Sequence, residues 1–226
     1  VVLQVVIGLS RALLVLQIPR GQGLLRVAAI LPIVLAPVVV GLFWRTLVLA
    51  PDFGLVDLVT RALGLGSHNW LGDPQLALIS VIAIHTWQWT PFIMLIALAG
   101  LASVPKTLFE AASVDRATEW FKFRFITIPT IAPLLMVALL FRTLDAFKMF
   151  DLAWIMTERG STVETVSVQV FREALRNWNT GKACAFAYIV LLVIIGLTNL
   201  YLMMMAKVKG EGPADAVPLF NPESPV

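Results

Sequence analysis

The sequence predicts an all-α membrane protein, a polytopic bundle of about five transmembrane helices. Of its 226 residues 59% are hydrophobic and only 14% are charged, a balance too apolar for the surface of a soluble domain. Several apolar stretches approach the roughly 20 residues that a helix needs to cross about 30 Å of hydrocarbon. Runs such as YIVLLVIIGLTNLYLMMM do not alternate apolar and polar residues, so helices are favoured over transmembrane β-strands.

Five apolar stretches account for the expected helices, which we place at residues 1–18, 24–49, 76–100, 129–150 and 183–206. The first stretch is interrupted by Arg11 and the third by His85. Together the helices are expected to form one membrane domain over residues 1–206. Residues 207–226 are rich in proline and glycine and are expected to form a flexible cytoplasmic tail.

The sequence begins with a valine inside an apolar run, without an initiator methionine. A secretory signal peptide would have a basic segment ahead of this run and a small-residue cleavage site after it, and neither is present. We therefore expect the sequence to be a fragment that lacks upstream residues.

Basic residues predict the orientation of the helices. They cluster in three regions that alternating spans place on one side: the first turn, the segment between the third and fourth helices, and the end of the last helix. The positive-inside rule makes that side the cytoplasm. The N-terminus of this sequence would then lie outside and the C-terminus in the cytoplasm. The residues are Arg20, Arg26, Lys106, Arg116, Lys122, Arg124, Lys207 and Lys209.

Familiar motifs of catalysis and metal binding are missing from the sequence. There is no HExxH, no GxSxG and no phosphate-binding GxxxxGKS or GxxxxGKT. Cys184 is the only cysteine, so neither a disulfide nor a CxxC metal pair can form within the sequence. Ser80 and His85 are five residues apart and would lie on different helix faces. We predict no catalytic residue and no metal site.

Nucleic-acid binding is also not expected. The net charge is only +3, and no basic stripe is interleaved with aromatic residues. Membrane lipid is the environment that the composition predicts.

One strongly charged segment, EAASVDRATEWFKFRFITIP at residues 110–129, lies between two of the most apolar stretches. We expect two short helices here. Ser103 as N-cap and Pro105 in the first turn would begin one, and Asp115 would cap the second. Two interpretations follow from the residues alone. Such a helix pair can lie passively on the membrane surface, or it can be a docking site for another protein.

The same segment resembles the EAA loop of permease subunits in ATP-driven (ABC) importers. The family pattern runs from Glu-Ala-Ala, through a glycine six residues after the glutamate, to an isoleucine, a leucine-like residue and a proline. The departure is Arg116, which stands where the family usually has the glycine that gives a turn its backbone freedom. The matching positions are Glu110, Ala111, Ala112, Asp115, Ala117, Ile126, Ile128 and Pro129.

The resemblance covers roughly residues 1–206 and indicates the carbohydrate-type branch of these permeases, that of the maltose transporter. It rests on the stretch from RGQGLLRV to TRALGL, on NWLGDP and on LLFRTLDAFKMFDLAWIMTERG. Permeases of this branch usually have a further N-terminal helix. The resemblance therefore implies a six-helix permease of a prokaryotic cell membrane, with its first helix upstream of this sequence.

By this resemblance, the protein would be a transport subunit of a sugar or polyol importer and would form half of the translocation pathway. A second homologous permease subunit would form the other half, an ATPase dimer would bind below, and an extracytoplasmic solute-binding protein would deliver the solute. ATP and Mg would be bound by the ATPase chains, so no cofactor is expected in this chain. Residues 103–128 would couple to the ATPase through Glu110, Ala111, Ala112, Asp115, Arg116 and Ala117.

The stretch HTWQWTPF is the first candidate for the substrate pathway. Trp87 and Trp89 can stack on the C–H faces of sugars, while Gln88 and Thr90 can supply hydrogen bonds. The alternative is that these residues only anchor the helix at the membrane interface and pack against its neighbours.

The stretch FRTLDAFKMFD is the second candidate, with charges of alternating sign at three-residue steps. Such neighbours can pair along a helix, which lowers the cost of charge near the membrane. Arg142 and Asp145 are the pathway candidates, and Arg142 lies deeper and also suits a subunit interface. Lys148 and Asp151 are better explained as the outer part of a self-neutralising ladder.

Two other functions stay open. An importer of this kind can carry a solute other than a sugar. A channel or secondary transporter would work without an ATPase, but the spacing of the EAA segment disfavours it.

Overall fold

The computed structural model describes residues 1–18, 22–157 and 162–209, and every regular element in these ranges is helical. The all-α prediction is therefore confirmed. Short π-helical turns at Trp44–Val48, Phe123–Thr127 and Arg172–Arg176 extend three of the helices. The α-helices are α1 (Val2–Gln17), α2 (Gln22–Val34), α3 (Pro37–Phe43), α4 (Leu55–Ala62), α5 (Pro74–Ser103), α6 (Lys106–Val114), α7 (Glu119–Lys122), α8 (Ile128–Phe147), α9 (Asp151–Met156), α10 (Val166–Phe171) and α11 (Thr180–Lys209).

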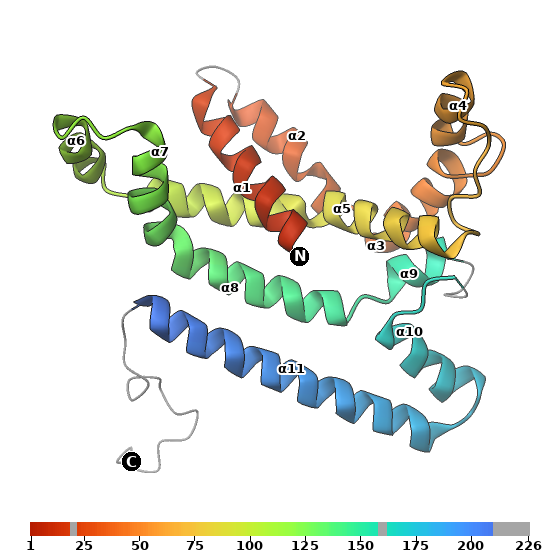
Figure 1. Ribbon diagram of the computed structural model, residues 1–226. Coiled ribbons are helices and arrows are strands. Elements are labelled where there is room, and N and C mark those ends of the chain that lie inside the picture. Colours follow the sequence, from red (N-terminus) through yellow and green to blue (C-terminus); the bar gives the residue numbers. More distant parts are fainter. Residues whose placement is uncertain (19–21, 158–161, 210–226) are drawn as a thin grey trace, which may run out of the picture.

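Three long helices, α5, α8 and α11, form the body of the molecule (Figure 1). α5 packs on α8, α8 packs on α11, and α1 lies across α5. Among the residues that the structure describes, three stretches are long and apolar enough to cross a membrane: Pro74–Ser103, Glu119–Phe147 and Thr180–Lys207. They correspond to the third, fourth and fifth predicted spans, so these predictions are confirmed apart from shifts at the helix ends.

The second predicted span, residues 24–49, is not one helix. It is broken into α2 and α3, whose axes are bent by 92°. Pro37 begins α3 and forces Ala36 into an extended conformation, with φ −60° and ψ 137°. Within the described ranges there are thus three candidate spans, or four if the bent pair is one span, together with the shorter apolar helix α1, instead of five straight spans.

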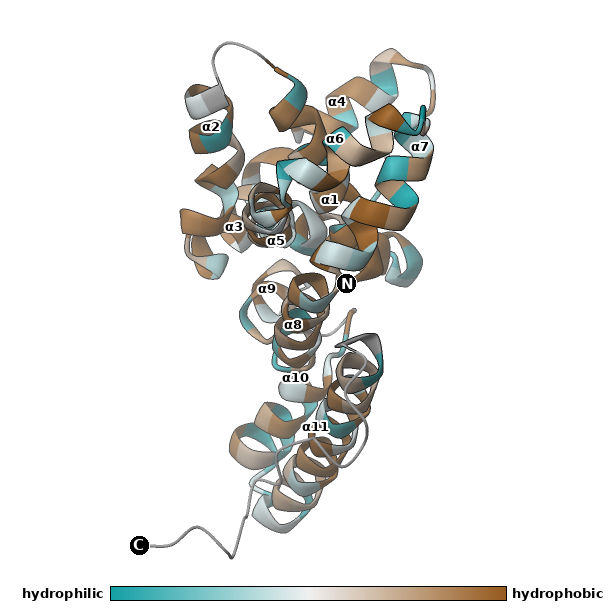
Figure 2. Ribbon diagram, turned by 90° about the vertical axis from the view of Figure 1, so that its left-hand side faces the viewer, coloured by the Kyte–Doolittle hydropathy of each residue, from teal (hydrophilic) through white to brown (hydrophobic). Residues whose placement is uncertain are grey.

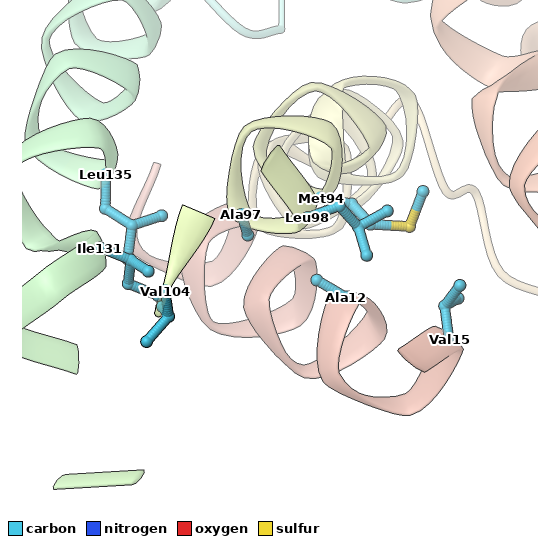
Figure 3. Close-up of a cluster of buried hydrophobic side chains, with 8 residues drawn as sticks. All are labelled: Ala12, Val15, Met94, Ala97, Leu98, Val104, Ile131 and Leu135. Carbon is cyan, nitrogen blue, oxygen red and sulfur yellow. The ribbon is translucent and has the colours of Figure 1, made fainter. Parts of the chain in front are cut away.

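The core between α1, α5 and α8 depends on small residues that let the helices approach closely. A side-chain carbon added at Gly8 of α1 would lie 2.8 Å from Cβ of Ile93 on α5. Figure 3 shows the apolar side chains that fill the contact from all three helices. They are Ala12, Val15, Met94, Ala97, Leu98, Val104, Ile131 and Leu135.

The two ends of the bundle differ in what they carry. At one end, which we call the α6 end, the chain forms the short helices α6 and α7 (Figure 1). At the opposite end, the α4 end, lie α4, α9 and α10. Apolar residues dominate α8 and α11 between these ends (Figure 2), and the apolar part of α11 is not buried within this chain. α11 therefore offers a face to lipid or to another subunit.

At the α6 end the two predicted helix starts were wrong. Ser103 is the last residue of α5, where its Oγ donates to the carbonyl of Gly100 at 2.7 Å; Pro105 is the N-cap of α6. Asp115 ends α6, and Thr118 caps α7 by accepting a hydrogen bond from the N–H of Phe121. Ser103 does not cap α6 because its hydroxyl bonds to the carbonyl of Gly100 in the preceding helix and not to an N–H of the following one.

Two further features concern the C-terminal tail and the segment after α7. α11 continues to Lys209 and so includes the first three residues of the predicted tail, 207–209. Residues 210–226 lie outside the described residues, as does Arg20. Phe121 and Phe125 share a helix face as their spacing requires, with ring centroids 4.7 Å apart.

Candidate functional site

A cavity of about 210 Å³ lies between α5, α8 and the segment that leads into α9. His85, Gln88 and Trp89 line it from α5, and their spacing of three and four residues places them on one helix face. Arg142 and Asp145, three residues apart, line it from α8. The remaining polar lining comes from Lys148 and Asp151.

The guanidinium of Arg142 is the centre of this site, with only 1% of the residue exposed. Nη1 donates to Oδ2 of Asp145 at 3.1 Å, and Nε donates to Oε1 of Gln4 at 3.3 Å. Nη2 lies 3.4 Å from Nε2 of His85, which must be the acceptor because arginine has only donors. Cζ lies 4.2 Å from the ring centroid of Trp89, in cation–π contact. We call these five residues the Arg142 cluster.

The Arg142 cluster joins three helices that are far apart in the sequence. Gln4 comes from α1, and its Nε2 also donates to the carbonyl of His85 on α5 at 3.1 Å. Charge at membrane depth is costly unless it is paired. Asp145, with a side chain 52% exposed, carries the compensating charge toward the cavity. The cluster therefore runs from the fully buried Gln4 to a half-open carboxylate at the cavity wall.

In the side-chain amide of Gln88 the nitrogen makes a hydrogen bond, whereas the oxygen makes none within the described residues. Its Nε2 donates to the carbonyl of Leu35 at 3.3 Å, in the break between α2 and α3. Its Oε1 is buried and accepts no hydrogen bond from the described residues. Leaving a buried acceptor unpaired costs about 1–3 kcal/mol. Gln88 also lines the cavity.

Two of the predicted pathway residues lie away from the cavity. Trp87 packs edge-on against Trp44, with ring centroids 5.6 Å apart, within the apolar cluster of α3, α5 and α9. Thr90 is buried and donates to the carbonyl of Thr86 at 2.6 Å. Of the two tryptophans in this stretch, Trp89 lines the cavity.

Sequence reasoning missed Gln4. The stretch HTWQWTPF included Trp89, and its spacing from His85 and Gln88 places these three residues on one helix face. Gln4 had no such signal, since its contact with Arg142 joins residues 138 positions apart and depends on how α1 packs across α5.

A second site lies at the α6 end. A groove of about 460 Å³ runs between α6, the turn after it and the π-helical segment that leads into α8. Glu110 and Ala111 are exposed on α6, and Ala112 is buried against the groove. Asp115 and Ala117 line the groove from the turn. The remaining lining residues are Leu108, Thr118, Phe121 and Ile126.

Arg116 occupies the turn in a conformation that favours glycine. Its φ is 54°, in the left-handed region, and it follows Asp115, the C-cap of α6. The turn is closed by hydrogen bonds from the N–H of Arg116 to Ser113 and from the N–H of Ala117 to Ala112. A non-glycine residue in this conformation costs about 1–2 kcal/mol. The turn thus keeps the backbone shape that the family's glycine permits.

The family to which this fold and this turn belong can be identified by comparison. A family model described as "Binding-protein-dependent transport system inner membrane component" matches residues 4–209. The chain belongs to this family. Members of the family are membrane components of transport systems, which confirms the prediction of a transport subunit rather than an enzyme.

Two relatives from sugar transport systems are similar over most of the chain. The trehalose/maltose transport system permease protein MalF of Thermococcus litoralis is 32% identical over 203 residues, which cover 88% of this chain and 68% of the relative. The trehalose transport system permease protein SugA of Mycobacterium tuberculosis is 33% identical over 191 residues, covering 84% and 60%. The chain thus spans about two thirds of the length of these relatives, and the resemblance to sugar ABC permeases is confirmed.

Solved structures share the fold. A bacterial ABC transporter that imports the acidic polysaccharide alginate superimposes with a TM-score of 0.79 at 23% identity, over 89% of this chain and 72% of that one. The same kind of transporter, in complex with an alginate pentasaccharide-bound periplasmic protein, gives 0.80 at 22% identity, over 91% and 73%. These matches show that the fold is shared. The family model and the two sugar-transport relatives favour an importer permease over a channel or secondary transporter.

Proposed function

We propose that this chain is a membrane-spanning subunit of an ATP-driven sugar or polyol importer in a prokaryotic cell membrane. The observation that carries the proposal is the exposed α6 turn: it combines the EAA residues with the backbone shape of the family's glycine, at one end of membrane-spanning helices. The remaining parts of the proposal concern coupling, the pathway and the orientation.

Coupling is assigned to residues 103–128. Glu110 is exposed on α6, and the small side chains of Ala111 and Ala112 beside it allow a partner to approach closely. Asp115, Arg116 and Ala117 form the turn that borders the groove. A short helix in a partner's cleft acts as a rigid lever when that partner closes. ATP and Mg would be bound by the ATPase dimer on which this helix sits, so this chain needs no cofactor of its own.

The pathway is assigned to the cavity beside the Arg142 cluster, within a membrane domain over residues 1–206. Gln88 offers an unpaired acceptor, Asp145 a half-exposed carboxylate and Trp89 an aromatic ring. Hydroxyl groups and C–H faces of a sugar match these three features. A second homologous permease subunit would complete the pathway, and a solute-binding protein would load it; the names of the relatives favour trehalose or maltose as first candidates.

Orientation follows from charge. α6, α7 and the C-terminal end of α11 all lie at the α6 end (Figure 1). Several basic residues belong to these elements, so the positive-inside rule assigns the α6 end to the cytoplasm. The N-terminus of this sequence would be outside, the C-terminus cytoplasmic, and the α4 end would face the solute-binding protein. The basic residues are Lys106, Arg116, Lys122, Arg124 and Lys207.

The test is reconstitution of the full-length protein with its co-expressed ATPase and second permease in proteoliposomes. We expect the ATPase to copurify with the permease, and radiolabelled trehalose, maltose or a polyol to enter only when ATP is supplied on the ATPase side. Uptake that needs no ATP, or a permease that purifies without any ATPase, would contradict the proposal.

A further inference from the structure

α4 and its neighbours expose an unusual amount of apolar surface for a segment outside the candidate membrane spans. The helix has an apolar face and an opposite polar face, as interfacial amphipathic helices do. Six apolar side chains are 52–70% exposed. They are Phe53, Leu55, Leu58, Val59, Leu63 and Leu65.

The polar face of α4 is turned inward and fixed. Asp57 is fully buried, and its Oδ1 accepts hydrogen bonds from Oγ of Ser67 at 2.9 Å and from the N–H of His68 at 3.1 Å. Its Oδ2 lies 2.8 Å from Nε of Arg61. Val56 packs against the apolar cluster under the helix. These contacts hold α4 so that its apolar face must point away from the protein.

The position of α4 keeps it close to the membrane surface. It lies at the end of the bundle with its axis across that of α5 (Figure 1). Residues 49–54 link α4 to the bent pair of α2 and α3, which together are long and apolar enough to form one span. A linker of this length reaches roughly 20 Å when fully extended. α5, a membrane-spanning helix, begins at Pro74. The helix is therefore tethered at both ends to helices that enter the bilayer.

The chemistry of the exposed face fits lipid better than a protein. Hot spots of protein interfaces are rich in Trp, Tyr and Arg, whereas Leu and Val are under-represented there. The exposed face of α4 itself is aliphatic, with Leu55, Leu58 and Val59. The first turns of α5 continue the apolar surface at the same end, with Leu78 and Ile79 exposed.

We propose that α4 is an interfacial helix, with Leu55, Leu58 and Val59 inserted into the lipid beside the bundle and Asp57 facing the protein. Interfacial helices of this kind bury their apolar face about 5–10 Å into the boundary between head groups and acyl chains. The helix thereby anchors the loop from Ala50 to Asp73 at a fixed depth. The inference needs only membrane residence and does not depend on the solute or on the ATPase.

The experiment uses the complete complex in lipid nanodiscs. Cys184 is first replaced by alanine, and a single cysteine is introduced as Leu58→Cys and labelled with an environment-sensitive fluorophore. Arg176→Cys, an exposed polar position in another segment at the same end, is the matched control. Fluorescence is recorded with lipids brominated near the head group and with iodide as a water-soluble quencher.

We expect brominated lipid to quench the label at Leu58→Cys strongly and iodide to quench it weakly, with the order reversed at Arg176→Cys. Addition of the solute-binding protein should leave the Leu58→Cys signal unchanged. Strong iodide quenching, shielding only when the binding protein is added, or shielding from both quenchers by the second permease would each overturn the inference.

Discussion

The Arg142 cluster and the α6 turn use charge in opposite ways. Arg142 is 1% exposed, and its donors are taken up by Gln4, His85 and Asp145 within the same chain. Glu110, by contrast, is exposed on a short helix at the end of the bundle. Charge that is satisfied inside the chain holds helices together, whereas charge displayed on a protruding helix is available to a partner. Stability and coupling are therefore separable by mutation.

The largest expected effect is the loss of transport in Glu110→Lys. Reversing one side of a desolvated, hydrogen-bonded charge contact costs about 2–5 kcal/mol. Insertion and abundance should stay normal, because Glu110 contacts no membrane-spanning helix in our account. Uptake in proteoliposomes measures the effect, and Glu164→Lys at the α4 end, where Glu164 pairs with Arg172, is the control that should keep transport. Normal uptake by Glu110→Lys would remove Glu110 from the coupling contact.

Arg142→Gln should have the opposite pattern to Glu110→Lys, because its main effect should be a loss of folding stability. The variant leaves Gln4 and His85 with fewer partners, at about 1–3 kcal/mol for buried groups left unsatisfied. The midpoint of thermal unfolding of the detergent-solubilised protein should fall, while Arg124→Gln, an exposed basic position at the α6 end, should leave it unchanged. Equal midpoints for both variants would show that the cluster does not hold the helices together.

A smaller effect, on uptake, is expected for Gln88→Leu, and it distinguishes a role of Gln88 in the cavity from a role in helix packing. Gln88→Leu loses the bond to the carbonyl of Leu35 but also removes the unpaired Oε1, so its stability should change little. Uptake should fall roughly 2- to 10-fold if a solute hydroxyl donates to that oxygen. Thr90→Val is the control, because Thr90 donates to its own helix and should not affect uptake. A decrease with Thr90→Val alone would place the pathway elsewhere.

The smallest effect is local and depends on pH. Burial raises the pKa of Asp57, but hydrogen bonds from His68 and Ser67 and the charge of Arg61 outweigh it, so the pKa is lowered. A lowered pKa stabilises the loop above the unfolded value of about 3.9 and loses that contribution as pH falls through the folded pKa. A nitroxide at Leu65→Cys, with Cys184 replaced, should gain mobility only in acid, and at every pH when Asp57→Asn is added. A spectrum that does not change with pH would contradict this role of Asp57.

Much of the fold was readable from the sequence because apolar length sets membrane spans. The break between α2 and α3 was not, since Pro37 can begin a helix or kink one, and the packing around it decides. In the cavity, Gln88, Arg142 and Asp145 followed from polarity and spacing. Gln4 did not, because its position beside Arg142 depends on how close Gly8 lets α1 approach α5. The prediction of Ser103 as an N-cap was wrong because its hydroxyl donates to the carbonyl of Gly100 within α5.

The most direct test of the central claim is photo-crosslinking from the α6 turn. A photoreactive benzoyl-phenylalanine is introduced at Glu110 in the full-length permease, the complex is assembled in membranes with its ATPase, and the products are identified by mass spectrometry. Our account predicts one main adduct, between this chain and the ATPase subunit, and none from the same probe at Glu164. Adducts only to lipid or to the second permease would contradict it, because the α6 turn would then lie on the membrane and not in an ATPase cleft.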